Sequence, residues 1–393
     1  MTRPTSEEAF EAHIARWLVE HGGYTLEKLG NQAPAARDFD PVLGLDGTEL
    51  FTFIGATQPS YWNLLVDRHG GSQELAQRRF KERLAKQLDA RGTVDVLRHG
   101  ITDQGVEFRL AYFLPASGLN QELLDLYAAN RLVVVRQFAY DVDSSKTVDV
   151  ALLVNGLLVA TAELKNPLSG QSIEHALHQY RHDRDPKNVA LTRRAVVHFA
   201  LDTELVQMTT RLSGRATRFL PFNQGRPDMG AGNPPNPRGH RTAYLWERVW
   251  QRDAWLDLIA RFIHVEAPEG APKARGTVIF PRFHQWDAVR RLEADAREHG
   301  AGRNYLVQHS AGSGKSNTIA WLSHRLASLH GAGDRAVFDK VIIITDRRVL
   351  DRQLQDTVYQ FEHTHGVVVR IDRNSAQLAE ALVGAQARII ITT

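Results

Sequence analysis

The chain has no cysteine among its 393 residues, which excludes disulfide bonds and metal sites built on thiolates. This fits a reducing cytoplasm, where we expect the protein to work. No apolar run reaches the ~20 residues of a membrane span, and the N-terminus lacks the apolar core of a secretion signal. Charge of one sign is not in excess, because 48 Lys and Arg against 45 Asp and Glu give a net charge of +3. Binding to polyanions would therefore depend on local patches.

Two stretches rich in proline and glycine, at 221–240 and 267–276, interrupt the pattern of helices and strands. We place a domain boundary in the second stretch, which gives domains at 1–266 and 267–393. The first domain is predicted to begin with an amphipathic helix over 6–21 and to hold a strand at 93–97. In the second domain, helices alternate with four predicted strands, which indicates a parallel sheet with helices on both faces. These strands are expected at 304–308, 341–345, 367–371 and 388–392.

A phosphate-binding loop is predicted between the strand at 304–308 and the helix that follows it. The segment His309 to Ser316 reads His-Ser-Ala-Gly-Ser-Gly-Lys-Ser. Its glycines allow the backbone N–H groups to approach a triphosphate, and Lys315 adds a full positive charge. The Ser316 hydroxyl can reach a Mg²⁺ ion, and His309 stands where the usual pattern begins with glycine. The sequence therefore predicts an ATP site with these contact residues: Ser310, Gly312, Ser313, Gly314, Lys315 and Ser316.

A second chemical centre is predicted in a β-hairpin, whose strands at 146–154 and 157–165 flank Asn155-Gly156. The hairpin carries Asp149 and, fourteen positions later, Glu163-Leu164-Lys165. Two carboxylates can hold a Mg²⁺ ion against a phosphodiester, and an adjacent ammonium can orient water or offset developing charge. We expect Asp149 and Glu163 to be metal ligands and all three residues to be catalytic. Glu8, or equally Glu7, is a candidate for a further metal contact.

The register of this hairpin decides whether the two carboxylates meet. A plain two-residue turn pairs Val154 with Leu157 and therefore Asp149 with Ala162, which leaves Glu163 facing the other side. A nuclease centre therefore requires a shift of one residue. A type I turn followed by a bulge at Gly156 in the left-handed region would supply it.

With these motifs, the chain resembles the restriction subunit of type I restriction–modification enzymes, which is both motor and nuclease. The resemblance covers nearly the whole sequence. It rests on Val148-Asp-Val-Ala-Leu-Leu-Val-Asn-Gly-Leu157, on Ala162-Glu-Leu-Lys-Asn-Pro167 and on the loop at 309–316. It implies a restriction-endonuclease-like (PD-(D/E)xK) domain, followed by a RecA-like parallel-sheet domain with an ATP site. This is an α/β fold class.

The resemblance also assigns roles to single residues. Gln285, in Pro281-Arg-Phe-His-Gln285, resembles the family's adenine-recognising glutamine. Arg347 and Arg348 resemble the motif that grips the DNA backbone in superfamily 2 helicases. A Gln-x-x-x-Tyr element would place its tyrosine at Tyr180, but Ala176 occupies the glutamine position. The implied partners are duplex DNA and the methyltransferase and specificity subunits of the same complex, without a membrane.

Elements of a complete motor are not found, since no Asp-Glu-x-x box follows a strand and a second motor domain is missing. We therefore expect the chain to be an N-terminal portion with an incomplete motor. The leading hypothesis is a Mg²⁺-dependent, ATP-coupled DNA endonuclease and translocase that cleaves unmodified foreign duplex DNA. The alternatives are a superfamily 2 helicase or remodelling ATPase whose first domain only docks partners, and a non-enzymatic assembly piece.

Overall fold

The computed structural model describes residues 6–26, 38–115, 118–142, 144–228, 230–266, 276–345, 354, 357–358 and 367–393. Backbone contacts divide the chain into two compact units. One consists of Met1–Leu114 and Glu122–Phe280, and the other of Pro115–Gln121 and Pro281–Thr393. The predicted boundary after residue 266 falls at a segment, 267–275, that lies outside the described residues. Among the described helices, none is long and apolar enough to cross a membrane.

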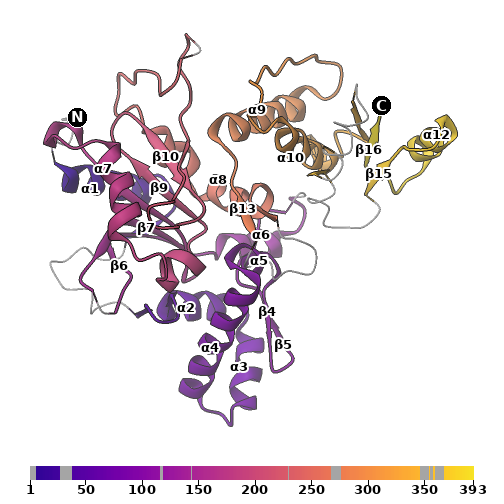
Figure 1. The fold of residues 1–393 in the computed structure, drawn as a ribbon. Helices are drawn as coiled ribbons and strands as arrows, with labels where there is room; N and C mark the ends of the chain where they lie inside the picture. The colour runs from indigo at the N-terminus through magenta and orange to yellow at the C-terminus, as the bar shows by residue number, and fades with distance from the viewer. Residues whose placement is uncertain are drawn as a thin grey trace. The chain divides into compact units, whose positions relative to one another are not determined.

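A mixed sheet forms the centre of the first unit, with strand order β1-β6-β7-β8-β9-β10-β11 (Figure 1). Strand β7 runs antiparallel to both β6 and β8, whereas β1 pairs with β6 in parallel and β8 pairs with β9 in parallel. The short β2 and β3 join the sheet through β8. The bounds are β1 (Thr25–Leu26), β2 (Phe39–Asp40), β3 (Leu45–Asp46), β6 (Leu132–Ala139), β7 (Thr147–Val154), β8 (Leu157–Leu164), β9 (Val197–Leu201), β10 (Val206–Thr209) and β11 (Leu220–Pro221).

Helices α1 and α7 pack against this sheet, α1 on β1 and β6, and α7 on β8 and β9. Ser6 caps α1 by accepting a hydrogen bond from the Ala9 N–H, and Phe10, Ile14 and Leu18 bury one stripe of the helix. The helices, turns and small strands of this unit are α1 (Glu7–Glu20), α2 (Gly47–Thr57), α3 (Pro59–Arg68), α4 (Gln73–Arg91), α5 (Thr93–His99), β4 (Ile101–Asp103), β5 (Val106–Phe108), α6 (Gln121–Ala128), η2 (Pro167–Ser169), α7 (Ile173–His178), η3 (Gln179–Asp183), η4 (Ala190–Arg194), η5 (Leu245–Val249), α8 (Arg252–Asp257), η6 (Leu258–Phe262), β12 (His264–Glu266) and β13 (Thr277–Ile279).

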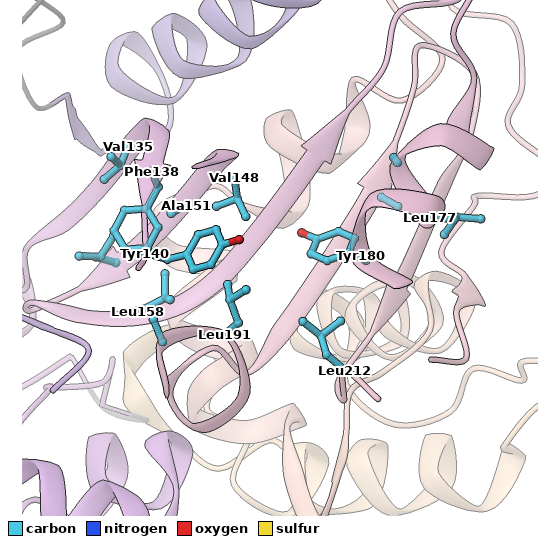
Figure 2. Close-up of a cluster of buried hydrophobic side chains, with 14 of the residues drawn as sticks. Val135, Phe138, Tyr140, Val148, Ala151, Leu158, Leu177, Tyr180, Leu191 and Leu212 are labelled. Atoms are coloured by element: carbon cyan, nitrogen blue, oxygen red, sulfur yellow. The ribbon is translucent and has the colours of Figure 1, made fainter. Parts of the chain in front are cut away.

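One hydrophobic cluster of the first unit lies between the sheet and the α7 region (Figure 2). All eight residues of β8 are buried, as are the last seven of β7. Strands covered on both faces carry nearly continuous apolar runs, which explains the sequence of this hairpin. The predicted helix over 6–21 and the hairpin are confirmed. The predicted strand at 93–97 is wrong, because these residues form α5. Burial of Val94, Val96 and Leu97 overrides the extended preference of β-branched residues.

The second unit contains a three-stranded parallel sheet in the order β14-β16-β15. The expectation of a parallel sheet in this part of the chain is therefore confirmed. Its described elements are α9 (Phe283–His299), α10 (Lys315–Ala327), η8 (Ala332–Asp334), β14 (Val341–Ile344), β15 (Val368–Arg370), α12 (Ser375–Val383) and β16 (Ile389–Thr392).

The predicted strand at 304–308 is wrong, because this segment pairs with none of the described strands. A strand exists only where a neighbouring backbone completes its hydrogen-bond ladder, however apolar its side chains are. Without that ladder the apolar side chains stay in solvent: Leu306 is 91% exposed, and Tyr305 and Val307 are 47% and 40% exposed.

Candidate functional site

The β7–β8 hairpin carries a one-residue register shift that brings Asp149 opposite Glu163. Val154 pairs with Leu157 and Leu153 with Leu158, but Leu152 pairs with Ala160, so Val159 is the extra residue. Val150 then pairs with Ala162, and the same register continued by one residue sets Asp149 opposite Glu163. Directly opposed side chains share one face of a sheet. The required shift is therefore present.

The shift does not come from a bulge at Gly156, which was one way for the sequence to supply it. Asn155 and Gly156 have φ of 49° and 82°, the signature of a tight type I′ turn without a bulge. The turn is held closely from outside, since a Cβ on Gly156 would lie 2.4 Å from the Asp46 carbonyl oxygen. The Asn155 side chain accepts a hydrogen bond from the Arg131 N–H and donates one to the Leu110 carbonyl. The surroundings thus fix the turn, and the bulge forms further along β8.

Each of the two opposed carboxylates uses one oxygen to bind protein and keeps the other less engaged. Asp149 Oδ2 accepts the Leu164 N–H at 2.7 Å, while its Oδ1 has a long contact of 3.4 Å with Gln137 Nε2. Glu163 Oε1 accepts two N–H groups of Arg184, and its Oε2 is buried with no hydrogen-bond partner in the described structure. Buried polar atoms without partners are rare and call for an explanation.

Lys165 completes the predicted trio but is held by helix α1. Its Nζ lies 2.8 Å from Glu7 Oε1 and donates to the Leu164 carbonyl oxygen at 2.8 Å, and only 3% of the residue is exposed. Glu8, the residue predicted to make a further metal contact, has an exposed side chain. Its carbonyl oxygen accepts a bond from Arg136. Of the two N-terminal candidates, Glu7 is the one whose carboxylate reaches the trio.

Glu11 is a residue of this centre that the sequence reading missed. It is 1% exposed, binds Arg136 Nε at 2.7 Å and accepts Gln137 Nε2 at 2.8 Å. The same Gln137 amide contacts Asp149, so the two carboxylates are neighbours. One signal was available, because Glu11 stands three residues before Ile14 and seven before Leu18 on the apolar stripe of α1. We call Asp149, Glu163, Lys165 and Glu11 the carboxylate centre.

Burial dominates the electrostatics of the carboxylate centre. It raises the pKa of Glu163 to about 8, and the charge of Asp149 acts in the same direction, while Arg184 and Lys165 oppose it. Burial also raises the pKa of Glu11, against the bonds that Gln137 and Arg136 make to the charged form. A cation placed among these groups would stabilise their ionised forms and release a proton.

The donor set fits a hard divalent cation that keeps part of its water shell. In the part of the chain that the structure describes, no group of three or more His, Cys, Asp or Glu could hold a metal by itself. Mg²⁺ is commonly bound by one or two carboxylates together with water and substrate phosphate. The unpartnered Glu163 Oε2 and the weakly engaged Asp149 Oδ1 are the two oxygens for that role.

A neutral polar network supports the centre from the α7 side. The Tyr180 hydroxyl lies 2.8 Å from Thr161 Oγ1, which lies 2.7 Å from His198 Nδ1. Burial lowers the pKa of His198 to about 3, so the ring is neutral. Tyr180 and Ala176 are both fully buried in the core. The two positions of the Gln-x-x-x-Tyr element, Ala176 and Tyr180, are therefore part of the hydrophobic core in this chain.

The predicted phosphate-binding loop, residues 309–316, has the expected backbone. Gly312 and Gly314 have φ of 72° and 83°, in the left-handed region that favours glycine, and α10 begins at Lys315. Lys315 Nζ donates to the Ser310 and His309 carbonyl oxygens at 2.9 and 3.3 Å. The Ser313 hydroxyl is buried without a hydrogen-bond partner in the described structure. Ser316 follows in the first turn of the helix.

Gln285, the residue expected to read adenine, lies against the end of this loop. Its Nε2 donates to the Gly314 carbonyl at 2.9 Å, and its Oε1 accepts the Arg282 N–H at 2.8 Å. Both ends of the amide are thus engaged, so adenine binding would require these bonds to exchange. Arg347 and Arg348, expected to contact the DNA backbone, lie outside the described residues.

Comparison with known sequences gives two family matches and assigns both regions. Residues 70–217, which include the hairpin, match the family described as type I restriction enzyme R protein N terminus. Residues 284–393, which include the loop at 309–316, match the family described as SWI2/SNF2 ATPase. No curated protein matches the chain. The match over residues 70–217 confirms the resemblance to the N-terminal part of type I restriction enzyme R proteins that the sequence predicted.

Proposed function

We propose that the chain is a DNA endonuclease and ATP-driven translocase subunit of a type I restriction enzyme, with a restriction-endonuclease-like first domain and a RecA-like second domain. One observation carries the nuclease assignment: the register shift at Val159 sets Asp149 opposite Glu163, whose Oε2 is buried without a hydrogen-bond partner in the described structure. The match to restriction R proteins over the same residues supports this assignment.

In this proposal, Asp149 and Glu163 hold a Mg²⁺ ion, which supplies charge stabilisation for the phosphodiester and lowers the pKa of water. Glu11 lies beside them and adds negative charge. Hydrolysis adds water across one P–O bond, giving a hydroxyl and a phosphomonoester. Lys165 can serve that reaction by orienting the water or offsetting the phosphate charge, once its ammonium leaves Glu7 for the substrate.

The second part of the proposal concerns ATP. The left-handed glycines and Lys315 at the start of α10 support triphosphate binding at the loop, and Ser316 is the proposed contact to Mg²⁺. The match to SWI2/SNF2 ATPases over 284–393 supports an ATP-driven motor. Gln285 is the proposed adenine contact, and Arg347 and Arg348 are the proposed DNA contacts.

The test uses the complete enzyme assembled with its methyltransferase and specificity subunits on unmodified duplex DNA. Asp149→Asn and Lys165→Ala are expected to abolish cleavage while DNA-stimulated ATP hydrolysis continues. Lys315→Ala is expected to abolish ATP hydrolysis and, with it, cleavage.

Lys146→Ala is the matched control, since it removes an exposed lysine that directly precedes β7 and donates to the Asp183 carbonyl. It is expected to leave both activities intact. Cleavage that survives Asp149→Asn and Lys165→Ala would contradict the nuclease assignment. It would favour the alternative, an ATPase whose first domain docks partners.

A further inference from the structure

The Arg184 guanidinium is bound to the Glu163 carboxylate inside the first unit. Its Nε lies 2.7 Å and its Nη2 2.6 Å from the same oxygen, Glu163 Oε1. The Arg184 side chain is 7% exposed and that of Glu163 is 0% exposed. A buried ion pair of this kind has little screening, so its geometry is held firmly.

A π-helical turn directly before Arg184 sets the position of this residue. Residues Gln179 to Asp183 form a π-helical turn, and the Arg184 N–H closes it on the Gln179 carbonyl at 3.2 Å. Single π-helical turns occur frequently at functional sites. Beyond the turn, the guanidinium lies 5.8 Å from the centre of the Tyr140 ring. Figure 2 shows the Tyr140 and Tyr180 hydroxyls pointing toward one another. Burial raises the pKa of both hydroxyls; the charge of Glu163 adds to this rise and that of Arg184 opposes it.

We propose that Arg184 is a positioning residue, which holds Glu163 Oε1 so that Oε2 is presented to a divalent cation. This inference rests on the proposed function, because it assigns the cation to the same carboxylates. A hydrogen-bonded partner behind a metal-binding carboxylate fixes the direction of its remaining oxygen, and loss of such partners weakens metal binding.

The pattern of contacts distinguishes a positioning role from competition with the metal. A guanidinium that replaced the cation would bind both carboxylate oxygens or bridge to Asp149. Here both N–H groups converge on Oε1, and Oε2 stays unpartnered in the described structure. Asp149 has the same arrangement, with Oδ2 tied to the Leu164 N–H and Oδ1 turned to a long contact. Each carboxylate thus has one oxygen held by short hydrogen bonds, while the other has a long contact or none in the described structure.

The experiment measures Mn²⁺ binding to the metal-free full-length protein without DNA, by titration calorimetry. Arg184→Met and Arg184→Lys are expected to raise the dissociation constant by about 10–100-fold, the lysine variant less, because an ammonium can restore one of the two bonds. In the assembled enzyme, the Mg²⁺ concentration that gives half-maximal cleavage should rise by the same factor. The rate at saturating Mg²⁺ should change far less.

Arg181→Met is the matched control. Arg181 stands in the same π-helical turn, but it donates to the Thr217 carbonyl and lies over Phe219. It is expected to leave Mn²⁺ affinity within about twofold of the wild-type value. Melting temperatures of all variants report folding, and Arg184→Lys keeps the charge if Arg184→Met does not fold.

Three outcomes separate this inference from the proposed function. Weaker Mn²⁺ binding by the folded Arg184 variants, with Arg181→Met unchanged, supports the positioning role. Unchanged or tighter binding in those variants overturns it while leaving the proposed function in place, provided that Glu163→Gln abolishes binding. A wild-type protein without any Mn²⁺ site sensitive to Glu163→Gln would overturn both.

Discussion

The two candidate sites of this chain differ in how completely their surroundings are formed. The carboxylate centre is buried, and its hydrogen bonds come from α1, β6, β8 and the turn before Arg184. The loop at 309–316 has its glycine conformations and its helix, but the segment before it, 304–308, pairs with no described strand. The β7–β8 hairpin and the segment 304–308 both carry apolar side chains, yet only those of the hairpin are buried.

The comparison shows that a loop can have the backbone conformation of its motif even where the segment next to it pairs with no described strand. The loop keeps left-handed glycines because local sterics dictate them, whatever the neighbouring strands do. The alignment of Asp149 with Glu163 depends on a ladder of long-range pairs and would not exist without β7 and β8. A local motif can therefore be read from sequence more safely than a constellation.

Hydrogen exchange should give the largest contrast between the two sites. Backbone amides of β8 from Val159 to Leu164 are buried in the sheet, so they should exchange only through large-scale opening. Amides at 305–308 have no ladder partner in the described structure and should exchange close to the free-peptide rate. We expect rates that differ by about ten-thousandfold or more, measured by mass spectrometry of the full chain. Similar protection in both segments would show that 304–308 is a paired strand.

Substitution of one leucine in each region should give the next largest difference. Leu158→Ala empties a fully buried position in the core of the first unit and should cost about 2–5 kcal/mol. Leu306→Ala removes a side chain that is 91% exposed and should change stability by less than about 0.5 kcal/mol. Scanning calorimetry of the two units can measure both effects. A large loss for Leu306→Ala would mean that this residue is covered in solution.

A smaller, pH-dependent effect should mark the carboxylate centre. Because the pKa of Glu163 is raised from 4.5 to about 8, the folded protein binds the proton more tightly than the unfolded chain. The metal-free wild type should therefore lose stability as pH rises from about 5 to 8, while Glu163→Gln lacks this loss. We therefore expect the melting temperature of Glu163→Gln, relative to that of the wild type, to be a few degrees higher at pH 8 than at pH 5. Melting curves of both proteins, recorded in chelator at pH 5 and pH 8, measure this difference. If the melting temperatures of the two proteins change with pH in the same way, the raised pKa of Glu163 is contradicted.

Much of the fold near the carboxylate centre could be predicted from the sequence. The hairpin followed from two apolar runs around Asn155-Gly156, and the need for a register shift followed from counting pairs. Its location at Val159 could not be predicted, because contacts from Asp46 and Arg131, distant in sequence, hold the turn tight. Periodicity alone could not reveal α5, whose helical state depends on tertiary burial.

The missed residues of the site share one property, which is that their partners lie far away in the sequence. Glu11 binds residues 125 and 126 positions away, and Arg184 binds a residue 21 positions away. A carboxylate within an apolar stripe was a usable signal for Glu11. Arg184 stands in a run of polar residues after α7, where nothing in the spacing distinguishes it from Arg181. Only the fold separates the two arginines.

The bulge at Val159 means that the two arms of the hairpin have unequal lengths between the turn and the acids. Loss of one codon from the β8 arm would straighten the ladder and still leave the two acids opposed. The same loss from the β7 arm would send them to opposite surfaces of the sheet. Single-residue deletions between the turn and the acids are therefore tolerated in the β8 arm only, although both arms are buried there.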